Sequence, residues 1–147
     1  MTRGPILLVD DDDNCVKMLS VAMEKLGTGN RLAIARDGEE ALAYLKGEGE
    51  FADREKHPFP LLILLDLRMP RMDGLQVLQW IRKESPFWWL PVIVLTISES
   101  DRDMWEAYRA GATSFMIKGN CLEDLMAELK SVLDHWGNFS VHPSSED

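Results

Sequence analysis

The sequence predicts an α/β domain built on a five-stranded, mostly parallel sheet. Segments with strand-like and helix-like patterns alternate along the chain, and two strand segments, 6–9 and 61–65, are apolar without a break. Uninterrupted apolar strands are typical of parallel sheets that helices cover on both faces. With 147 residues, 46% of them hydrophobic, the chain is long enough for one domain with a core. We expect that domain over residues 1–137, a polar tail over 138–147 and no output domain.

The first strand and helix are indicated at the start of the chain. Residues 6–9 are expected to form the strand, and apolar residues then recur at helical spacing until Gly27, a residue that favours a helix end. Asp12 or Asp13 is expected to cap this helix, because a short acidic side chain accepts hydrogen bonds from the first free N–H groups.

A second, weaker strand is expected over residues 31–35. A short amphipathic helix should follow, with Asp37 as its cap and Gly47 at its end. The polar segment 48–60 contains two prolines and is expected to be an exposed connection, longer than most such connections.

The third strand, 61–65, is the most hydrophobic segment and leads into a loop and a helix that Asp73 should cap. A fourth strand is expected over 92–95. The helix after it should run from about residue 99 to residue 110 and end at Gly111.

The fifth strand is expected over residues 115–117. A last amphipathic helix should start beside Asn120 and stop at Gly137. Its apolar face is predicted to carry the following residues: Leu122, Leu125, Leu129, Val132 and Trp136.

Charge and composition exclude several classes of function. The net charge is −9 and the lysines and arginines are scattered, which argues against nucleic-acid binding through a basic patch. The start of the chain lacks a signal-peptide pattern, no apolar run approaches the ~20 residues of a membrane span, and there are only two cysteines. We therefore expect a cytoplasmic protein with no membrane association.

Carboxylates gather where two buried strands end. Four aspartates, 10–13, follow the first strand, and Asp66 ends the third. If the first and third strands are neighbours, as is common in small open sheets, Asp10, Asp11 and Asp66 converge at one edge. Neighbouring carboxylates repel one another and need a cation or a proton, and Mg²⁺ prefers such oxygen ligands. Asp12 and Asp13 are better explained as helix caps than as metal ligands.

Two further residues fall at the same edge: Thr96 at the end of the fourth strand and Lys118 at the end of the fifth. With Asp10-Asp11 and the stretch 65–74 (Leu-Asp-Leu-Arg-Met-Pro-Arg-Met-Asp-Gly), they match a known pattern in the same order. The chain resembles a response-regulator receiver domain of two-component signalling over residues 6 to about 136. The resemblance implies a flavodoxin-like, doubly wound (βα)5 fold with strand order 2-1-3-4-5.

The resemblance also implies the roles of the site residues. Asp66 would accept a phosphoryl group from a histidine kinase or phosphotransfer protein. Asp11, Asp66 and the main-chain carbonyl of Arg68 would bind Mg²⁺, with Asp10 in support. Lys118 would contact the phosphoryl oxygens. No enzyme is implied beyond Mg-dependent self-phosphorylation and self-dephosphorylation.

A conformational switch is implied by the same resemblance. Thr96 would move toward the phosphoryl group, and Phe115 would turn inward into the space it leaves. The surface formed by the fourth helix, the fifth strand and the fifth helix would change and carry the signal to a partner.

Three departures from the family pattern bear on these expectations. Gly119 follows Lys118 where a proline is usual, so a cis peptide cannot be assumed there. Ile97 is larger than the usual alanine or glycine and is expected to narrow access to Asp66. Arg68 and Ser98 occupy the two positions that tune phosphoryl lifetime in the family. Ile97 is expected to affect that lifetime as well.

Within the family, the chain looks most like single-domain regulators paired with bacterial phytochrome kinases. This suggests a phytochrome as partner, although any histidine kinase or phosphotransfer protein would serve physically. Trp105, Tyr108, Trp136 and Phe139 fall on or near the fourth and fifth helices, and we expect a homodimer through that face.

Three other functions fit the sequence less well. The alternative within the family is a degenerate receiver that binds partners without being phosphorylated, favoured only by Ile97 and Gly119. A flavodoxin-like electron carrier needs phosphate-binding donors where this chain has four aspartates. An aspartate-nucleophile phosphatase normally has a second aspartate two residues after its nucleophile, where this chain has Arg68.

Overall fold

The structure, a computed structural model, describes residues 4–69, 71–97, 100–118 and 122–135. Its described part contains one sheet of five parallel strands, in the order β2-β1-β3-β4-β5. The predicted fold class and strand order are therefore confirmed. The strands are β1 (Ile6–Val9), β2 (Leu32–Ala35), β3 (Leu62–Leu65), β4 (Val92–Thr96) and β5 (Ser114–Ile117).

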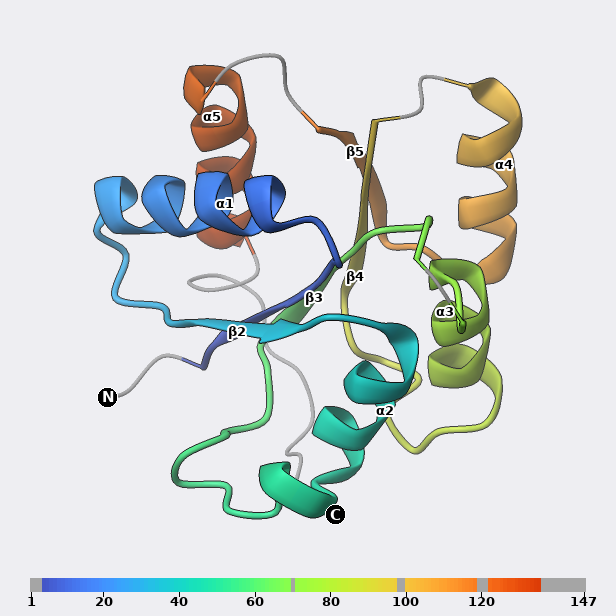
Figure 1. The fold of residues 1–147 in the computed structure, drawn as a ribbon. Helices are drawn as coiled ribbons and strands as arrows, with labels where there is room; N and C mark the ends of the chain where they lie inside the picture. The colour runs from blue at the N-terminus through green and yellow to red at the C-terminus, as the bar shows by residue number, and fades with distance from the viewer. Residues whose placement is uncertain (1–3, 70, 98–99, 119–121, 136–147) are drawn as a thin grey trace.

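Helices connect the strands and cover both faces of the sheet. They are α1 (Asp13–Leu26), α2 (Gly38–Lys46), the short 3-10 helix η1 (Gly49–Phe51), α3 (Gly74–Lys83), α4 (Asp101–Ala110) and α5 (Leu122–Leu133). Figure 1 shows α1 and α5 on one face of the sheet and α2, α3 and α4 on the other. This is the layering that right-handed connections between parallel strands produce.

Each face of the sheet has its own apolar core. Leu8 and Leu64 point toward α1 and α5 and pack there with Leu19, while Val9 and Leu65 point to the opposite face and pack with Val77 of α3. All six side chains are fully buried. Because β1 and β3 are buried on both faces, their uninterrupted apolar sequence follows directly from their central place in the sheet.

The predicted helix ends are largely correct. The side chains of Asp12, Asp37 and Asp73 cap α1, α2 and α3. Gly27, Gly47 and Gly111 end α1, α2 and α4 with left-handed backbone conformations.

Two expectations for the middle of the chain need correction. The helix expected from about residue 99 begins at Asp101, because the Ser100 hydroxyl accepts a hydrogen bond from the Asp103 N–H (3.4 Å) and acts as the cap. The connection 48–60 is not uniformly exposed. Phe51 is buried, and the Arg54 guanidinium donates to the carbonyls of Tyr44 and His57 at 2.9 and 3.1 Å, so a packed segment ties this connection to α2.

The end of the sheet opposite the aspartates is closed by aromatic side chains. Phe59 packs against Phe87 and Trp89, with ring centroids 4.8 and 6.0 Å apart. Trp88 between them is 63% exposed. Phe59 and Trp89 come shortly before β3 and β4, so they lie at the end of the sheet away from Asp66.

The last helix is shorter in the described residues than the sequence predicts. α5 spans Leu122–Leu133, and its fully buried residues are Leu125, Leu129 and Leu133. The expected start at Asn120, the expected end at Gly137 and the tail 138–147 lie outside the described residues. None of the described helices combines the length and apolarity needed to cross a membrane.

Candidate functional site

The predicted acidic site forms at the carboxyl ends of the two central strands. β1 and β3 pair in parallel with Val9 beside Leu65, so the next residues, Asp10 and Asp66, leave the sheet side by side. The Asp66 N–H donates to the Val9 carbonyl at 2.9 Å, which continues the ladder to that residue. Strand pairing thus places two carboxylates together that are far apart in the sequence.

Asp11 completes the acidic cluster. Carboxylate oxygens of Asp10, Asp11 and Asp66 all lie within 4.8 Å of one another. Asp10 is fully buried, Asp66 is 6% exposed and Asp11 is exposed. Three hard oxygen donors of this geometry, one of them open to solvent, suit a cation such as Mg²⁺.

Lys118 lies beside two of these carboxylates. Its Nζ is 2.8 Å from Asp10 Oδ2 and 3.7 Å from Asp66 Oδ2, and its side chain is only 17% exposed. The ammonium group reaches this place because Lys118 directly follows β5 at the same edge of the sheet. The Lys118 N–H also donates to the Thr96 carbonyl at 2.6 Å, which joins the ends of β4 and β5.

The two buried carboxylates differ in their acid–base behaviour. Burial, reinforced by the negative charge of Asp10, raises the pKa of Asp66 to about 6, although Lys118 opposes the shift. Burial also acts to raise the pKa of Asp10, but hydrogen bonds from Cys15 and Lys118 outweigh it and leave that pKa below its ordinary value. Burial acts to lower the pKa of Lys118, and its contacts with Asp10 and Asp66 raise it overall. The positive charge of Lys118 therefore neutralises Asp10 more than Asp66.

Sequence reasoning missed Cys15. This buried residue of α1 donates a hydrogen bond to Asp10, and burial beside that carboxylate raises the pKa of its thiol to about 12. A sequence signal existed in principle, because Cys15 lies on the same helix face as Leu19 and that face packs on the sheet. Its contact with Asp10 depends on the turn between β1 and α1 and could not be anticipated.

The loop after β3 is held close to Asp66. The Arg68 N–H donates to Asp66 Oδ1 at 3.2 Å, and the Gly74 N–H donates to the Leu67 carbonyl at 3.0 Å. Gly74 packs so tightly that a Cβ there would lie 2.7 Å from Leu67 Cα. Arg68 thus lies close to Asp66, as predicted, and the role of its carbonyl as a metal ligand stays a prediction.

The two predicted switch residues lie at or near the same edge. Thr96 ends β4 and is 1% exposed. Phe115 of β5 is half-buried and packs against the core on the α2, α3 and α4 side. Their predicted movements stay predictions.

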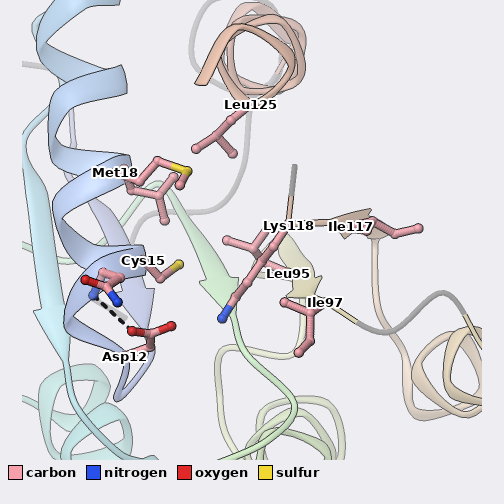
Figure 2. Close-up of a pocket in the computed structure, with 10 residues that line it drawn as sticks. Asp12, Cys15, Met18, Leu95, Ile97, Ile117, Lys118 and Leu125 are labelled. Atoms are coloured by element: carbon pink, nitrogen blue, oxygen red, sulfur yellow. Dashed lines mark hydrogen bonds between the residues drawn. The ribbon is translucent and has the colours of Figure 1, made fainter. Parts of the chain in front are cut away.

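Ile97 lines a cleft of about 290 Å³ beside the acidic cluster. Figure 2 shows its side chain next to that of Lys118, with Cys15 and Met18 of α1 and Leu125 of α5 on the other side. Ile97 is 74% exposed, so its side chain forms part of the surface around the site. Ser98 and the Lys118–Gly119 peptide lie outside the described residues.

Asp12 caps α1 as expected, whereas Asp13 is the first residue of the helix and not its cap. Asp12 accepts a hydrogen bond from the Asn14 N–H at 2.9 Å as the cap of α1. Asp13 forms an ion pair with Arg36. The acidic cluster of Asp10, Asp11 and Asp66 includes neither of these two aspartates.

Comparison with known proteins identifies the family. The model of the response regulator receiver domain matches residues 6–130. This chain belongs to the response-regulator receiver family. The match includes the acidic cluster, Thr96 and Lys118, so it covers the whole candidate site.

The matches to two curated relatives cover most of this chain and most of the relative's own length. The probable methanogenesis regulatory protein FilR2 of Methanothrix harundinacea is 35% identical over 94% of this chain and 86% of its own. Response regulator Rcp1 of Synechocystis is 33% identical over 89% of this chain and 87% of its own.

Solved structures of phytochrome-associated regulators are similar throughout. The response regulator RPA3017, described in red light signaling of R. palustris, has a TM-score of 0.89 and 32% identity, over 96% of this receiver and 99% of its own chain. The phosphorylated cyanobacterial phytochrome response regulator RcpA has a TM-score of 0.84 at 31% identity, over 97% and 99%. The Mn²⁺-bound form of Rcp1 has a TM-score of 0.79 at 33% identity, over 96% and 99%. The predicted likeness to single-domain phytochrome regulators is confirmed.

Proposed function

We propose that this receiver is a phosphorylation-controlled signalling switch whose acceptor is Asp66. The observation that carries the proposal is the buried Asp66 carboxylate, 3.7 Å from the Lys118 ammonium and grouped with Asp10 and Asp11. A histidine kinase or a phosphotransfer protein would supply the phosphoryl group. The carboxylate oxygen of Asp66 would attack phosphorus, and the phosphohistidine nitrogen would leave.

The donor set fits Mg²⁺. Asp11 and Asp66 would hold the ion with the main-chain carbonyl of Arg68. Asp10, whose carboxylate lies within 4.8 Å of both, would support them. Bound there, the ion would screen the carboxylates and the incoming phosphoryl group from each other. The Mn²⁺-bound form known for Rcp1 supports a divalent-cation site in this family.

Lys118 and Thr96 would recognise the new phosphoryl group. The Lys118 ammonium is a fixed positive charge beside Asp66, and a charge-assisted hydrogen bond to a phosphoryl oxygen is stronger than a neutral one. Thr96, at the end of the adjacent strand, would donate its hydroxyl to another phosphoryl oxygen. We assign no turnover of a separate substrate to the site, only self-phosphorylation and self-dephosphorylation.

The signal would leave the site through the face of α4, β5 and α5. Movement of Thr96 toward the phosphoryl group would free space near β5, and Phe115, now half-buried, would turn into it. Couplings of this kind are typically about 1–3 kcal/mol, which is enough to control the binding of a partner.

The cleft in Figure 2 is the proposed docking place of the phosphoryl donor. Its lining combines Lys118, which contacts Asp10 and Asp66, with apolar residues that include Met18, Ile97 and Leu125. The similarity to a cyanobacterial phytochrome response regulator and to a regulator in red light signaling supports a phytochrome-type histidine kinase as the donor. A cytoplasmic location fits such a donor.

A direct experiment is phosphorylation by acetyl phosphate. Wild type with Mg²⁺ should form a labile adduct of one phosphoryl group, and Asp66→Asn and wild type in EDTA should form none. Asp13→Asn is the matched control, since Asp13 lies outside the acidic cluster and should leave the adduct unchanged. If wild type stays unmodified with both acetyl phosphate and a histidine kinase, the phosphorylation-independent binding module is the better explanation.

A further inference from the structure

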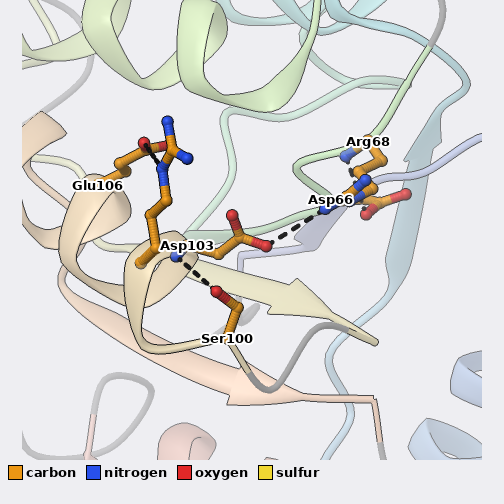
Figure 3. Close-up of polar contacts among 6 residues, drawn as sticks. Asp66, Arg68, Ser100, Asp103 and Glu106 are labelled. Atoms are coloured by element: carbon orange, nitrogen blue, oxygen red, sulfur yellow. Dashed lines mark hydrogen bonds and ion pairs between the residues drawn. The ribbon is translucent and has the colours of Figure 1, made fainter.

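An ion pair links the loop after β3, which follows Asp66 and is called the acceptor loop below, to α4. The Arg68 side chain, two residues after Asp66, reaches across to the first turn of α4, where its Nη2 is 3.3 Å from Asp103 Oδ2. Figure 3 shows the guanidinium between Asp66 on one side and Asp103 on the other. The two paired residues are 35 positions apart in the sequence.

The direction of the Arg68 side chain depends on this contact. Its main chain is fixed by the hydrogen bond to Asp66 Oδ1, but the side chain is 73% exposed, so packing does not hold it. The carboxylates of Asp11 and Asp66 are also near the acceptor loop and would attract a free guanidinium. Asp103 therefore competes with the acidic cluster for one cation.

Asp103 is a firm anchor for that cation. Its side chain is only 22% exposed, and its N–H is bonded to the Ser100 hydroxyl that caps α4. The neighbouring Arg102 is paired with Glu106 at 3.1 Å. The carboxylate thus projects from a capped helical turn, whereas the arginine is a long, exposed side chain.

We propose that Asp103 is a positioning residue that holds the Arg68 guanidinium away from Asp66 and thereby shortens the lifetime of the phosphoryl group. This inference rests on the proposed phosphorylation of Asp66. It concerns which anion binds Arg68, and it identifies a residue of α4 as a determinant of the rate at which the signal decays.

The competition between Asp103 and the acidic cluster for the Arg68 guanidinium changes once Asp66 is phosphorylated. A phosphoryl group brings a charge of about −1.5 to −2 and strong acceptor oxygens, and arginine binds such oxygens in a bidentate manner. In hydrolysis a water oxygen bonds to phosphorus as the bond between phosphorus and the Asp66 oxygen breaks. Both water protons leave with the phosphate as H₂PO₄⁻, and the carboxylate is regenerated. A guanidinium over the phosphoryl oxygens obstructs that water, so a released Arg68 slows the reaction.

A double-mutant cycle tests the inference. The rate of phosphoryl loss would be measured with Mg²⁺ for wild type, Asp103→Asn, Arg68→Ala and the double variant. Asp103→Asn should lengthen the lifetime by about two- to fivefold, the range that exposed ion pairs support. In the Arg68→Ala background the same substitution should have no effect. A shorter lifetime, an unchanged lifetime, or a change that persists without Arg68 would overturn the inference.

Two controls separate positioning from helix stability. Asp101→Asn removes an exposed charge from the same helical turn and should lower the melting temperature as much as Asp103→Asn without changing the lifetime. Asp103→Glu keeps the charge and should restore a lifetime close to that of wild type. If wild type takes up no phosphoryl group, the proposed function fails as well. If wild type is phosphorylated and Asp103→Asn decays like it, only this inference fails.

Discussion

Lys118 forms a close ion pair with Asp10, with Nζ 2.8 Å from Oδ2, and lies farther from Asp66, whose Oδ2 is 3.7 Å away. Asp10 is fully buried and cannot rely on water, so the lysine stabilises its charge. Asp66 is left with an incompletely balanced charge, in agreement with its raised pKa. The Asp66 carboxylate therefore has room in its charge balance for a second cation.

Lys118→Gln should destabilise the metal-free protein. The substitution leaves the buried Asp10 carboxylate without its cation, and breaking a buried pair from one side typically costs about 3–5 kcal/mol. Urea unfolding in EDTA should show a loss near the low end of that range, because Lys118 is 17% exposed. Lys130→Gln, an exposed lysine of α5, should change little. Equal effects of the two substitutions would contradict the pairing.

The pH dependence of stability should report the raised pKa of Asp66. Because its pKa is about 6 in the folded protein and near 3.8 when unfolded, the folded state binds more protons between these values. The contribution of Asp66 to stability is thus full below about pH 4 and is lost as the pH rises through 6. In EDTA, Asp66→Asn should be more stable than wild type at pH 7, by about 3 kcal/mol at most.

The measurement for that prediction is urea unfolding of both proteins from pH 4 to pH 7.5. The difference in the free energy of unfolding should shrink as the pH falls and should disappear near pH 4. At neutral pH, added Mg²⁺ should stabilise wild type more than Asp66→Asn, because the variant lacks one carboxylate of the cluster. A pH-independent difference would show that the pKa of Asp66 is not raised.

Gly74→Ala should disturb the acceptor loop itself. An added Cβ would meet the Asp66 carbonyl and Leu67 Cα, both of the main chain, so the loop would have to move. We expect a loss of about 2–4 kcal/mol in the free energy of unfolding, together with slower phosphorylation. Gly27→Ala is the control: nothing lies within 4 Å of its Cβ, although its φ is 61°. It should cost only about 1 kcal/mol and leave phosphorylation unchanged.

Cys15 should resist alkylation in the folded protein. Burial and the contact with Asp10 raise the pKa of its thiol to about 12, and the thiolate is the reactive form. In a Cys121→Ser background, iodoacetamide at pH 8 should modify Cys15 at least about a hundredfold more slowly than free cysteine. Urea should restore the ordinary rate. Rapid labelling of the folded protein would contradict the contact with Asp10.

The homodimer predicted from the sequence can be tested on α4. Trp105 and Tyr108 are 65% and 44% exposed there, while Trp136 and Phe139 lie outside the described residues. Sedimentation at tens of micromolar should give a dimer, and Trp105→Ala should weaken association about tenfold or more. Trp88→Ala, which removes an exposed tryptophan at the other end of the sheet, should not. A monomer mass for wild type, phosphorylated or not, would refute the dimer.

The sequence was most informative where one local pattern determines the structure. The apolar segments 6–9 and 61–65 indicated central strands, and aspartates such as Asp73 cap helices through contacts with their own neighbours. Residues that directly follow strands, such as Asp66 and Lys118, could be brought together once the strand order was assumed. These predictions require only periodicity and pairing.

Contacts that depend on tertiary packing could not be predicted from the sequence. The bond of Cys15 to Asp10 requires the turn before α1, and the pair of Arg68 with Asp103 joins the loop after β3 to the first turn of α4, 35 residues away. The connection 48–60 looked exposed because its composition is polar, yet Arg54 and Phe51 pack it against α2. In each case a side chain contacts a partner that no local pattern indicates.

The most direct measurement is chemical mapping of the modified residue. Borohydride reduces an aspartyl phosphate to homoserine, so protein treated with acetyl phosphate and Mg²⁺ can be reduced, digested and sequenced by mass spectrometry. The proposed function predicts homoserine at residue 66 alone. An unchanged residue 66, or homoserine at residue 10, 11 or 12, would contradict it.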